Sequence, residues 1–451
     1  MSPHAVLVDS SSPDVDVRSR SLLKNYSITR NAFLPESSPA TSLADPYYQP
    51  WEAIAAALPL LIASGDIQHT IAQMPLLSTD RLANEAEWRR AYVLLGFMTH
   101  AHVWGGQTPR DVLPPQITVP FLAVSHHLEL QPVLTYAAAN LWNFTSTHPQ
   151  ADFSDIDALE TLVSFTGTES ERWFLLISVC MEARGARIID IMLDALEAVK
   201  ARDYDVIIAA LKELAACIES VGDLLGRMDE KCDPMVFYHQ IRPFLAGSKN
   251  MAGAGLPRGV FYDEGDGKGE WRQLRGGSNG QSSLIQFFDV VLGVDHNGKG
   301  TGPAEKKEAE QKEAQPNDEK CFHAQVRDYM PGPHARFLTH VAQMGSIRQL
   351  ALLSSKTDEQ KDLQAAYTAA TDALTEFRNV HIRIVSRYIV VPSRKPRPAC
   401  LGGPVSAQKN LASSSDRSGK VEDLTGTGGT ALMPFLKQTR DETKEAGSLL
   451  D

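Results

Sequence analysis

One histidine, His381, occupies a position in the sequence that suits it to bind a metal. Between residues 363 and 392 apolar side chains recur at steps of three, four and seven, and His381 falls on the same stripe. A helix with this spacing buries the stripe and exposes its other face to water. A neutral imidazole on an apolar wall can bind the iron of a haem, and nearby cations can meet the haem propionates. Arg378, Arg383 and Arg387 are the cations closest to it in the sequence.

A structural role is the alternative for His381. A single histidine on an apolar helix face is more often a core residue than a ligand. The chain contains no CxxCH motif, which excludes covalent attachment of a c-type haem. Other segments must therefore decide between iron ligation and simple burial.

The segment 276–280 formally matches G-x-S-x-G, the motif in which Ser278 would be the nucleophile of a hydrolase. That motif requires a strand, a sharp turn and a helix within a chain where strands and helices alternate, and this chain lacks the alternation. Two other interpretations stay open: a glycine-rich turn in which Ser282 or Ser283 caps the next helix, or backbone N–H groups that cradle an anion. No Walker lysine follows the glycines, so the case for nucleotide binding is weak.

Arg242 follows two aromatic residues, Phe237 and Tyr238, by about one turn of helix. Arginine is suited to bidentate binding of a carboxylate, and aromatic rings hold a planar ligand. The alternative is a partly buried helix whose arginine pairs with an acidic neighbour, and spacing alone favours it. The pair His126 and His127 is excluded as a metal site, because adjacent residues do not face the same point.

Composition narrows the class of protein. The chain has 451 residues and a net charge of −11, which argues against nucleic acid as the main partner because phosphate binding needs a basic face. Its five cysteines are scattered without metal-ligand spacing, which fits a reducing compartment. The first 20 residues lack the apolar core of a secretion signal, and no apolar run is long enough to span a bilayer. The sequence therefore predicts a cytoplasmic protein with no membrane partner.

Helical periodicity dominates the chain and strand signals are few, so the predicted fold class is all-α. We expect a mobile N-terminal arm over 1–45, a small helical domain over 46–160 and a large helical domain over 161–451. Within the large domain the composition predicts one long helix over 173–193, an irregular loop over 253–280, a disordered insertion over 298–319 and a flexible loop over 393–423.

Several segments resemble the haem pocket of the indoleamine 2,3-dioxygenase family. They are 276–283 (GGSNGQSS), 287–293 (FFDVVLG), 329–331 (YMP), 381–388 (HIRIVSRY) and 426–430 (GTGGT). The resemblance implies a small helical domain packed on a large helical domain that holds haem b. It also implies an enzyme that inserts both atoms of O₂ across the indole C2–C3 bond of L-tryptophan. The product would be N-formyl-L-kynurenine, the first step of the kynurenine pathway toward NAD synthesis.

The resemblance also implies roles for individual residues. His381 corresponds to the proximal iron ligand, and three residues correspond to catalytic positions: Ser178 as the distal serine, Phe237 as the distal aromatic and Arg242 as the carboxylate clamp. The remaining positions are Tyr136, Phe174, Ser278 and Thr427 for the substrate, and Gly277, Ser278, Arg378 and Asp289 for the cofactor. Thr427 lies in a segment, 424–440, that would supply a loop closing over the substrate and a C-terminal helix.

Other expectations follow from the same resemblance. The enzyme would be a monomer and would need an electron donor to reduce ferric haem. A serine rather than a histidine at position 178 favours the indoleamine type over the other tryptophan dioxygenase family, with a broader substrate range. Trp173, Ala139, Asn140 and the 298–319 insertion depart from the family pattern. The alternative function is therefore a haem-binding paralogue of low activity with a signalling or haem-responsive role.

Overall fold

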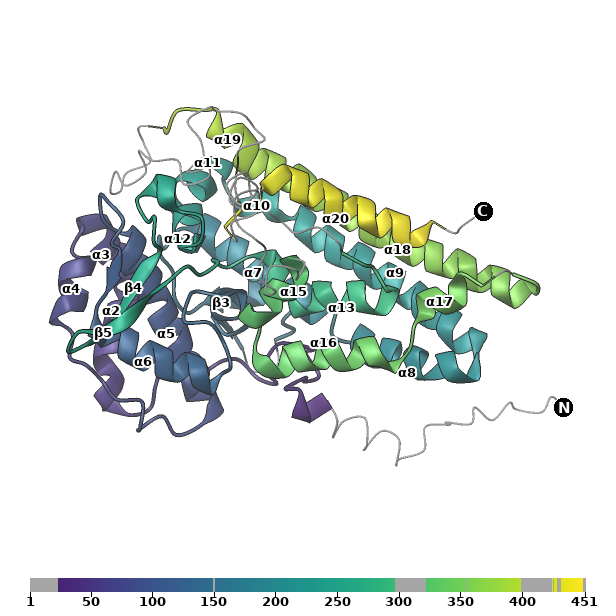
Figure 1. Ribbon diagram of the computed structural model, residues 1–451, viewed down its shortest axis with the longest axis horizontal. Coiled ribbons are helices and arrows are strands. Elements are labelled where there is room, and N and C mark those ends of the chain that lie inside the picture. Colours follow the sequence, from purple (N-terminus) through teal and green to yellow (C-terminus); the bar gives the residue numbers. More distant parts are fainter. Residues whose placement is uncertain are drawn as a thin grey trace, which may run out of the picture.

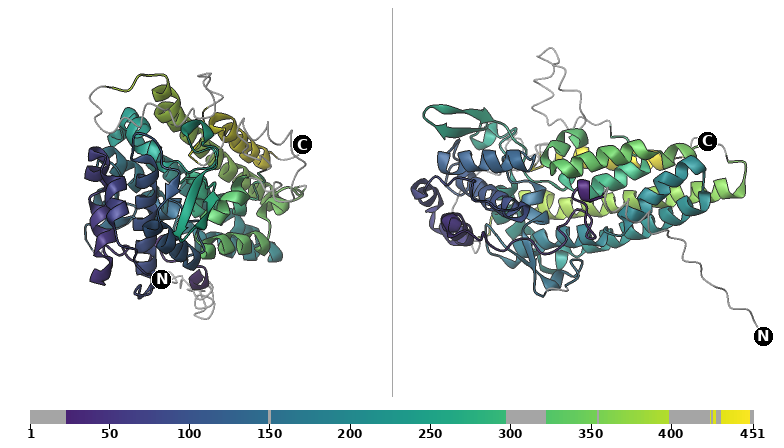
Figure 2. Two further views of the ribbon diagram at one scale, coloured as in Figure 1. Left: turned by 60° about the vertical axis from the view of Figure 1, so that its left-hand side comes forward. Right: turned by 90° about the horizontal axis from the view of Figure 1, so that it is seen from below.

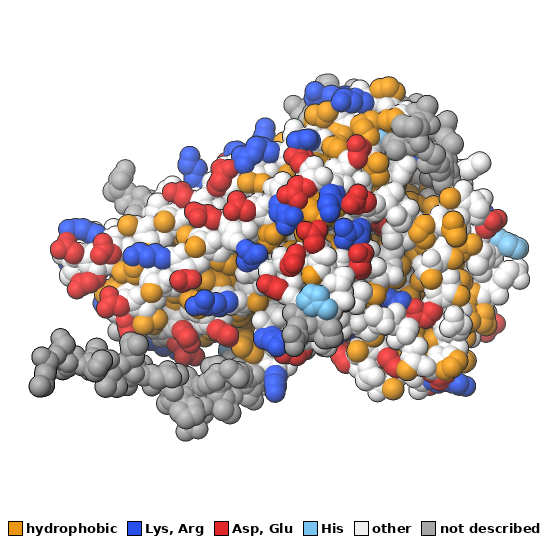
Figure 3. Space-filling model, turned by 180° about the vertical axis from the view of Figure 1, so that it is seen from behind, with side chains coloured by type: hydrophobic (Ala, Val, Ile, Leu, Met, Phe, Trp, Pro, Cys, Tyr) orange, Lys and Arg blue, Asp and Glu red, His pale blue; other side chains and the backbone are white. Residues whose placement is uncertain are grey.

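The computed structural model describes residues 23–148, 151–296, 322–353, 355–398, 424, 426–427 and 431–448. Most of these residues are helical, which confirms the all-α class. Figure 1 shows the helices in two groups, one around α5 on the left and one around α18 on the right. On the face seen in Figure 3, acidic and basic side chains are interspersed. Among the described helices, none combines the length and apolar character that crossing a bilayer requires.

The first group surrounds α5 (Glu85–Trp104), whose residues from Ala91 to Trp104 are all buried. Asn84 caps this helix by accepting a hydrogen bond from the backbone N–H of Glu87. Around it lie α2 (Gln49–Ala56), α3 (Leu58–Ser64), α4 (Ile67–Gln73) and α6 (Pro115–His127).

A small sheet also belongs to this group. Strand β1 (Val112–Leu113) pairs in parallel with β4 (Val260–Gly265), and β4 pairs antiparallel with β5 (Lys268–Arg272). The β4–β5 hairpin lies within the segment expected to be an irregular loop, and it stands at the end of the molecule in Figure 2. Strands β4 and β5, which follow residue 160 in the sequence, therefore belong to the first group, on the other side of the expected domain boundary.

The second group is built along α18 (Asp358–Val385), which begins with a capping box made by Thr357 and Gln360. Helices α9 (Tyr204–Gly226) and α20 (Leu432–Gly447) run beside it (Figures 1 and 2). The group is completed by α7 (Glu169–Arg184), α8 (Ile188–Ala201), α13 (Ser283–Leu292), α16 (Gly332–Met344) and α17 (Ile347–Ala351).

The single helix expected over 173–193 is two helices, α7 and α8. The break follows Gly185, where a Cβ atom would lie 2.5 Å from the side chain of Leu284 on α13. Glycine at this position therefore permits the close approach of α13 to the end of α7.

Among the described residues, three π-helices interrupt the helical pattern: η2 (Ala137–Leu141), η4 (Phe237–Ile241) and η8 (Ser386–Val390). Short helices flank the last two, with α11 (Pro234–Val236) and α12 (Arg242–Leu245) around η4 and α19 (Val391–Ser393) after η8. The helix predicted over 363–392 is therefore regular only as far as Val385. Such turns are frequent at functional sites.

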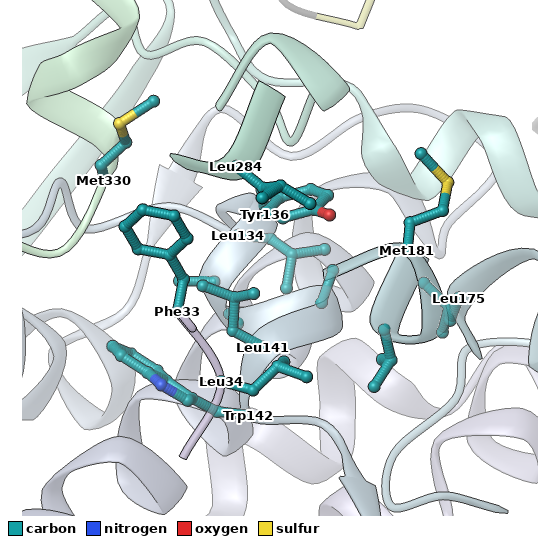
Figure 4. Close-up of a cluster of buried hydrophobic side chains, with 14 of the residues drawn as sticks. Phe33, Leu34, Leu134, Tyr136, Leu141, Trp142, Leu175, Met181, Leu284 and Met330 are labelled. Carbon is teal, nitrogen blue, oxygen red and sulfur yellow. The ribbon is translucent and has the colours of Figure 1, made fainter. Parts of the chain in front are cut away.

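Residues 23–45 lie against the rest of the protein. Ile28, Phe33 and Leu34 are buried, and the ring of Phe33 meets that of His334 at 5.1 Å. Figure 4 shows Phe33 and Leu34 beside Leu141. The expectation of a mobile arm is therefore wrong for residues 23–45, because their apolar side chains join the core. Residues 1–22, the 298–319 insertion and most of 393–423 lie outside the described residues.

The shorter elements are η1 (Pro46–Tyr48), β2 (Phe144–Ser146), η3 (Ile156–Ala158), β3 (Leu159–Thr161), α10 (Met228–Lys231), η5 (Ala252–Ala254), η6 (Asn279–Gln281), α15 (Phe322–Val326) and η7 (Arg327–Tyr329). Strands β2 and β3 form an antiparallel pair.

Candidate active site

One cavity is lined by residues of α7, α13, α18 and α20, together with the glycine-rich segment 277–280. The empty space within it, including the solvent at its open mouth, is about 1770 Å³. All three π-helices contribute to its wall. The predicted site residues that line it are Tyr136, Phe174, Ser178, Phe237, Arg242, Gly277, Ser278, Arg378, His381 and Thr427. Asp289 is the one predicted site residue that does not line it.

His381 lies on the wall of this cavity that α18 supplies. Burial, and secondarily the charge of Arg378, lower the pKa of His381 to about 4, so the ring is neutral at neutral pH. Ile384 and Val385 continue the wall on the next turn. Within the part of the chain that the structure describes, no side chain or backbone group is hydrogen bonded to this ring. A neutral imidazole with its nitrogen free to coordinate fits the requirement of a haem iron.

Arg378, one turn before His381, forms a buried ion pair with Asp289 of α13. Its Nη2 lies 2.6 and 2.8 Å from the two carboxylate oxygens, and its Nη1 donates to the carbonyl of Thr439 at 2.7 Å and to the hydroxyl of Thr443. Burial alone would raise the pKa of Asp289, but the charge of Arg378 holds it well below its usual range. These contacts of Arg378 join α13 and α20 to α18 at the cavity wall.

Arg383 and Arg387 do not line the cavity. Arg383 pairs with Glu376 at 3.0 Å and Arg387 with Asp229 at 2.6 Å, and both arginine side chains are more than half exposed. Of the three arginines near His381 in the sequence, Arg378 is the one that lines the cavity.

Two histidines that sequence reasoning missed extend the ion pair of Arg378. His296 Nδ1 lies 2.8 Å from a Glu442 oxygen and its Nε2 lies 3.2 Å from Asp289, while its ring stacks on that of His323 at 3.9 Å. Burial opposes protonation of His296, but Asp289 outweighs that effect and raises its pKa. Burial and the neighbouring His296 lower the pKa of His323 well below its ordinary value. Because Arg378 already occupies both oxygens of Asp289, we interpret the cluster as an electrostatic network in which His296 lies between two carboxylates and stacks on His323.

Arg242 begins α12, directly after the π-helix η4. Its side chain is buried, and burial lowers its pKa to about 10, so it remains a cation at neutral pH. The rings of Phe174 and Phe237 meet at 4.9 Å beside it on the cavity wall, and Phe237 meets Tyr388 edge-on at 5.8 Å. Aromatic walls and a buried guanidinium suit a planar ligand that carries a carboxylate.

A buried carboxyl group, Glu182, also borders the cavity and was missed by the sequence interpretation. Tyr136 donates to its Oε1 at 3.0 Å and Ser282 donates to the same oxygen at 2.6 Å. Oε2 has no hydrogen-bond partner among the described residues. Burial raises the pKa of Glu182 to about 7. An acid four residues after Ser178 in a strongly apolar helix is the signal that could have revealed it.

The glycine-rich segment does not form the nucleophile site of a hydrolase. Ser278 caps the short helix η6 by accepting a hydrogen bond from Gly280 N–H at 3.3 Å, and no described histidine is hydrogen bonded to it. Ser282 caps α13, as expected. Thr427 lies against this segment, donating to the carbonyl of Gly277 at 2.7 Å. The C-terminal segment and the glycine-rich segment therefore form one continuous edge of the cavity.

Comparisons with known proteins agree with this arrangement. Residues 22–446 match the family model described as indoleamine 2,3-dioxygenase. An indoleamine 2,3-dioxygenase of Aspergillus nanangensis is 39% identical over 433 residues, which cover 94% of this chain and 97% of the relative. One from Penicillium citrinum is 38% identical over 433 residues, covering 94% and 88%. A 6-hydroxytryptophan 2,3-dioxygenase of Fusarium equiseti is 36% identical over 425 residues, covering 94% and 97%.

Proposed function

The chain belongs to the indoleamine 2,3-dioxygenase family of oxidoreductases, and we propose that it uses haem b to convert L-tryptophan and O₂ to N-formyl-L-kynurenine. The observation that carries the proposal is that one cavity brings together a neutral His381 and a buried Arg242. The first suits an iron ligand and the second suits the carboxylate of an amino acid. An electron donor would keep the iron reduced, and the product would enter the kynurenine pathway toward NAD.

The residues present fit haem. His381 would hold the iron, and the Arg378–Asp289 pair would fix the helix that carries this histidine. Haem, when bound, supplies the activation of O₂. Gly277 and Ser278, on the glycine-rich edge, are the residues we assign to contact with the cofactor rim.

The other side chains of the cavity would orient the substrate. Arg242 would bind the carboxylate, and Phe174 and Phe237 would flank the indole ring, so that its C2–C3 bond is presented in one orientation. Tyr136 would close one wall, and its hydroxyl is already held by Glu182. At their two positions of the wall Ser178 and Phe237 would offer a neutral hydroxyl and an apolar ring, and no charged group. Thr427 would close the edge beside Gly277 after the substrate has entered.

The proposal is tested with purified protein loaded with haem and reduced without O₂. L-Tryptophan and O₂ are then added, and the absorbance of N-formylkynurenine is followed. We expect steady formation of this product from the wild-type protein. Because one relative is named for 6-hydroxytryptophan, the same assay is run with that compound to establish which indole is preferred.

Two variants serve as controls for the cofactor. His381→Ala should lose haem and product together, whereas His127→Ala, at an exposed histidine of α6, should keep both. A normal haem spectrum in His381→Ala would contradict the ligand role. A good haem spectrum in the wild type with no product from either indole would favour the alternative function, a haem-binding protein of low activity.

A further inference from the structure

His100 joins two separate segments of the cavity wall through its two ring nitrogens. It lies on α5 and is 3% exposed. Its Nδ1 is 2.6 Å from the carbonyl oxygen of Phe244, and its Nε2 is 3.1 Å from the backbone nitrogen of Leu134. These partners are more than one hundred residues apart in the sequence, and one imidazole ring spans the space between them.

Both contacts require the same form of the ring. A carbonyl oxygen can only accept, so Nδ1 must carry the hydrogen, and an amide N–H can only donate, so Nε2 must carry the lone pair. Burial lowers the pKa of His100 to about 4, so the ring keeps this neutral form at neutral pH. A protonated ring would lose the contact with Leu134.

Each contact lies next to a residue of the candidate active site. Phe244 is in α12, the one-turn helix that begins with Arg242. The last carbonyl groups of a helix have no partner inside it, and here two side chains of α5 supply donors: His100 to Phe244, and Trp104 to Ala246 at 2.8 Å. Leu134 lies two residues before Tyr136, directly ahead of the π-helix η2.

We infer that His100 is a positioning residue for substrate selection: its contact with Phe244 fixes the turn that carries Arg242, and its contact with Leu134 holds the ring in the orientation and tautomer that donate to Phe244. The inference rests on the proposed function, in which Arg242 binds the substrate carboxylate. If the turn at Phe244 relaxes, the guanidinium shifts and the pocket loses its preference for an indole with a carboxylate. His100 itself does not line the cavity, so it acts only through its two partners.

The same helix provides a matched control. His102 is also buried, and burial lowers its pKa to about 4 as well. Its Nε2 lies 3.1 Å from the carbonyl oxygen of Val112 on strand β1, which does not line the cavity. His102→Phe therefore removes a buried histidine hydrogen bond from α5 without touching either wall segment.

Three substitutions separate the two contacts of His100. Phenylalanine removes both. Asparagine places an amide donor near the position of Nδ1 and keeps the contact with Phe244, whereas glutamine places an amide oxygen near Nε2 and keeps the contact with Leu134. The measurement is calorimetric binding of L-tryptophan and of tryptamine, which lacks the carboxylate, to haem-loaded protein. The ratio of the two dissociation constants reports carboxylate selection.

We expect His100→Phe to weaken L-tryptophan binding about tenfold and to leave tryptamine binding within about twofold. The reason is that the carbonyl of Phe244, in the turn that carries Arg242, loses its buried hydrogen bond. His100→Asn should keep the wild-type ratio, and His100→Gln should lose it as His100→Phe does. His102→Phe should match the wild type. Equal ratios in all four variants, or equal loss in the asparagine and glutamine variants, would overturn the inference.

Hydrogen exchange of the backbone amides tests the positioning role of His100 without any substrate. His100→Phe should speed exchange at 134–136 and 242–246, whereas His102→Phe should not, and unchanged exchange would overturn the inference. If the wild type binds no L-tryptophan, the proposed function fails, and exchange alone still tests the positioning role. If His100→Phe does not fold, the asparagine and glutamine variants, each keeping one contact, provide the same comparison.

Discussion

The hydroxyl of Tyr136 donates a 3.0 Å hydrogen bond to Glu182, a carboxyl group that is 1% exposed. Burial raises the pKa of this carboxyl from 4.5 to about 7 in the folded protein. Between these two pKa values the folded state therefore binds more protons than the unfolded state does. The free energy of unfolding falls as pH rises through this range, because the buried carboxyl must ionise in the folded protein. A shift of this size corresponds to about 3 kcal/mol at pH 8.

Glu182→Gln removes the titrating group and keeps an oxygen that can accept from Tyr136 and Ser282. We expect this variant to unfold at higher urea concentration than the wild type at pH 8 and to lose that advantage near pH 5. Urea titrations across this range measure the difference. Glu213→Gln, at an exposed position on α9, is the control and should follow the wild type. Parallel profiles for Glu182→Gln and the wild type would contradict the prediction.

Arg242 should determine affinity for the substrate without affecting the cofactor. Arg242→Ala is expected to weaken L-tryptophan binding about 10- to 100-fold, because a buried, charge-assisted hydrogen-bonded contact is lost. Arg242→Lys keeps the charge but not the planar fork, so its affinity for L-tryptophan should lie between those of the wild type and Arg242→Ala. Substrate saturation and the haem spectrum are measured together.

Arg383→Ala is the control for these arginine variants, because Arg383 is exposed and pairs with Glu376 at the surface. It should leave both saturation and spectrum unchanged. An unaltered half-saturation concentration in Arg242→Ala would remove Arg242 from the proposed site.

The buried pair of Asp289 and Arg378 predicts sensitivity to acid. Because the pKa of Asp289 is held below its ordinary value in the folded protein, the pair stabilises fully above the unfolded pKa of about 3.9. That stabilisation is lost as pH falls through the lower, folded value. Asp289→Asn leaves Arg378 buried with a weaker partner and should cost about 3–5 kcal/mol at pH 7.

The loss is measured by urea unfolding at pH 7, 5 and 3. The stability of Asp289→Asn should depend less on pH in acid than that of the wild type. Asp441→Asn, which removes an exposed carboxylate of α20, should behave as the wild type does. A loss at pH 7 no larger than that of Asp441→Asn would show that the buried pair contributes little.

The sequence predicts the helices well because their apolar residues repeat with the helical period. The hairpin β4–β5 was missed because its glycines mimic an irregular loop, and the π-helices were missed because one additional residue per turn leaves the apolar pattern almost unchanged. The placement of His381 on an apolar wall could be predicted because the stripe from Leu363 to Ile384 lies in one helix. His100 and His296 could not be recognised, because their partners Phe244 and Glu442 are 144 and 146 residues away.

The π-helices determine how a single-residue deletion would affect this protein. A π turn contains one residue more than an α turn, so removing a single residue from 386–390 would restore ordinary α bonding while α18 and α19 keep their relative phase. In such a shortened chain Tyr388 and Ile389 would change direction relative to the cavity that they now line. A single-residue deletion at 386–390 is therefore expected to alter the cavity wall more than the packing of α18 against its neighbours.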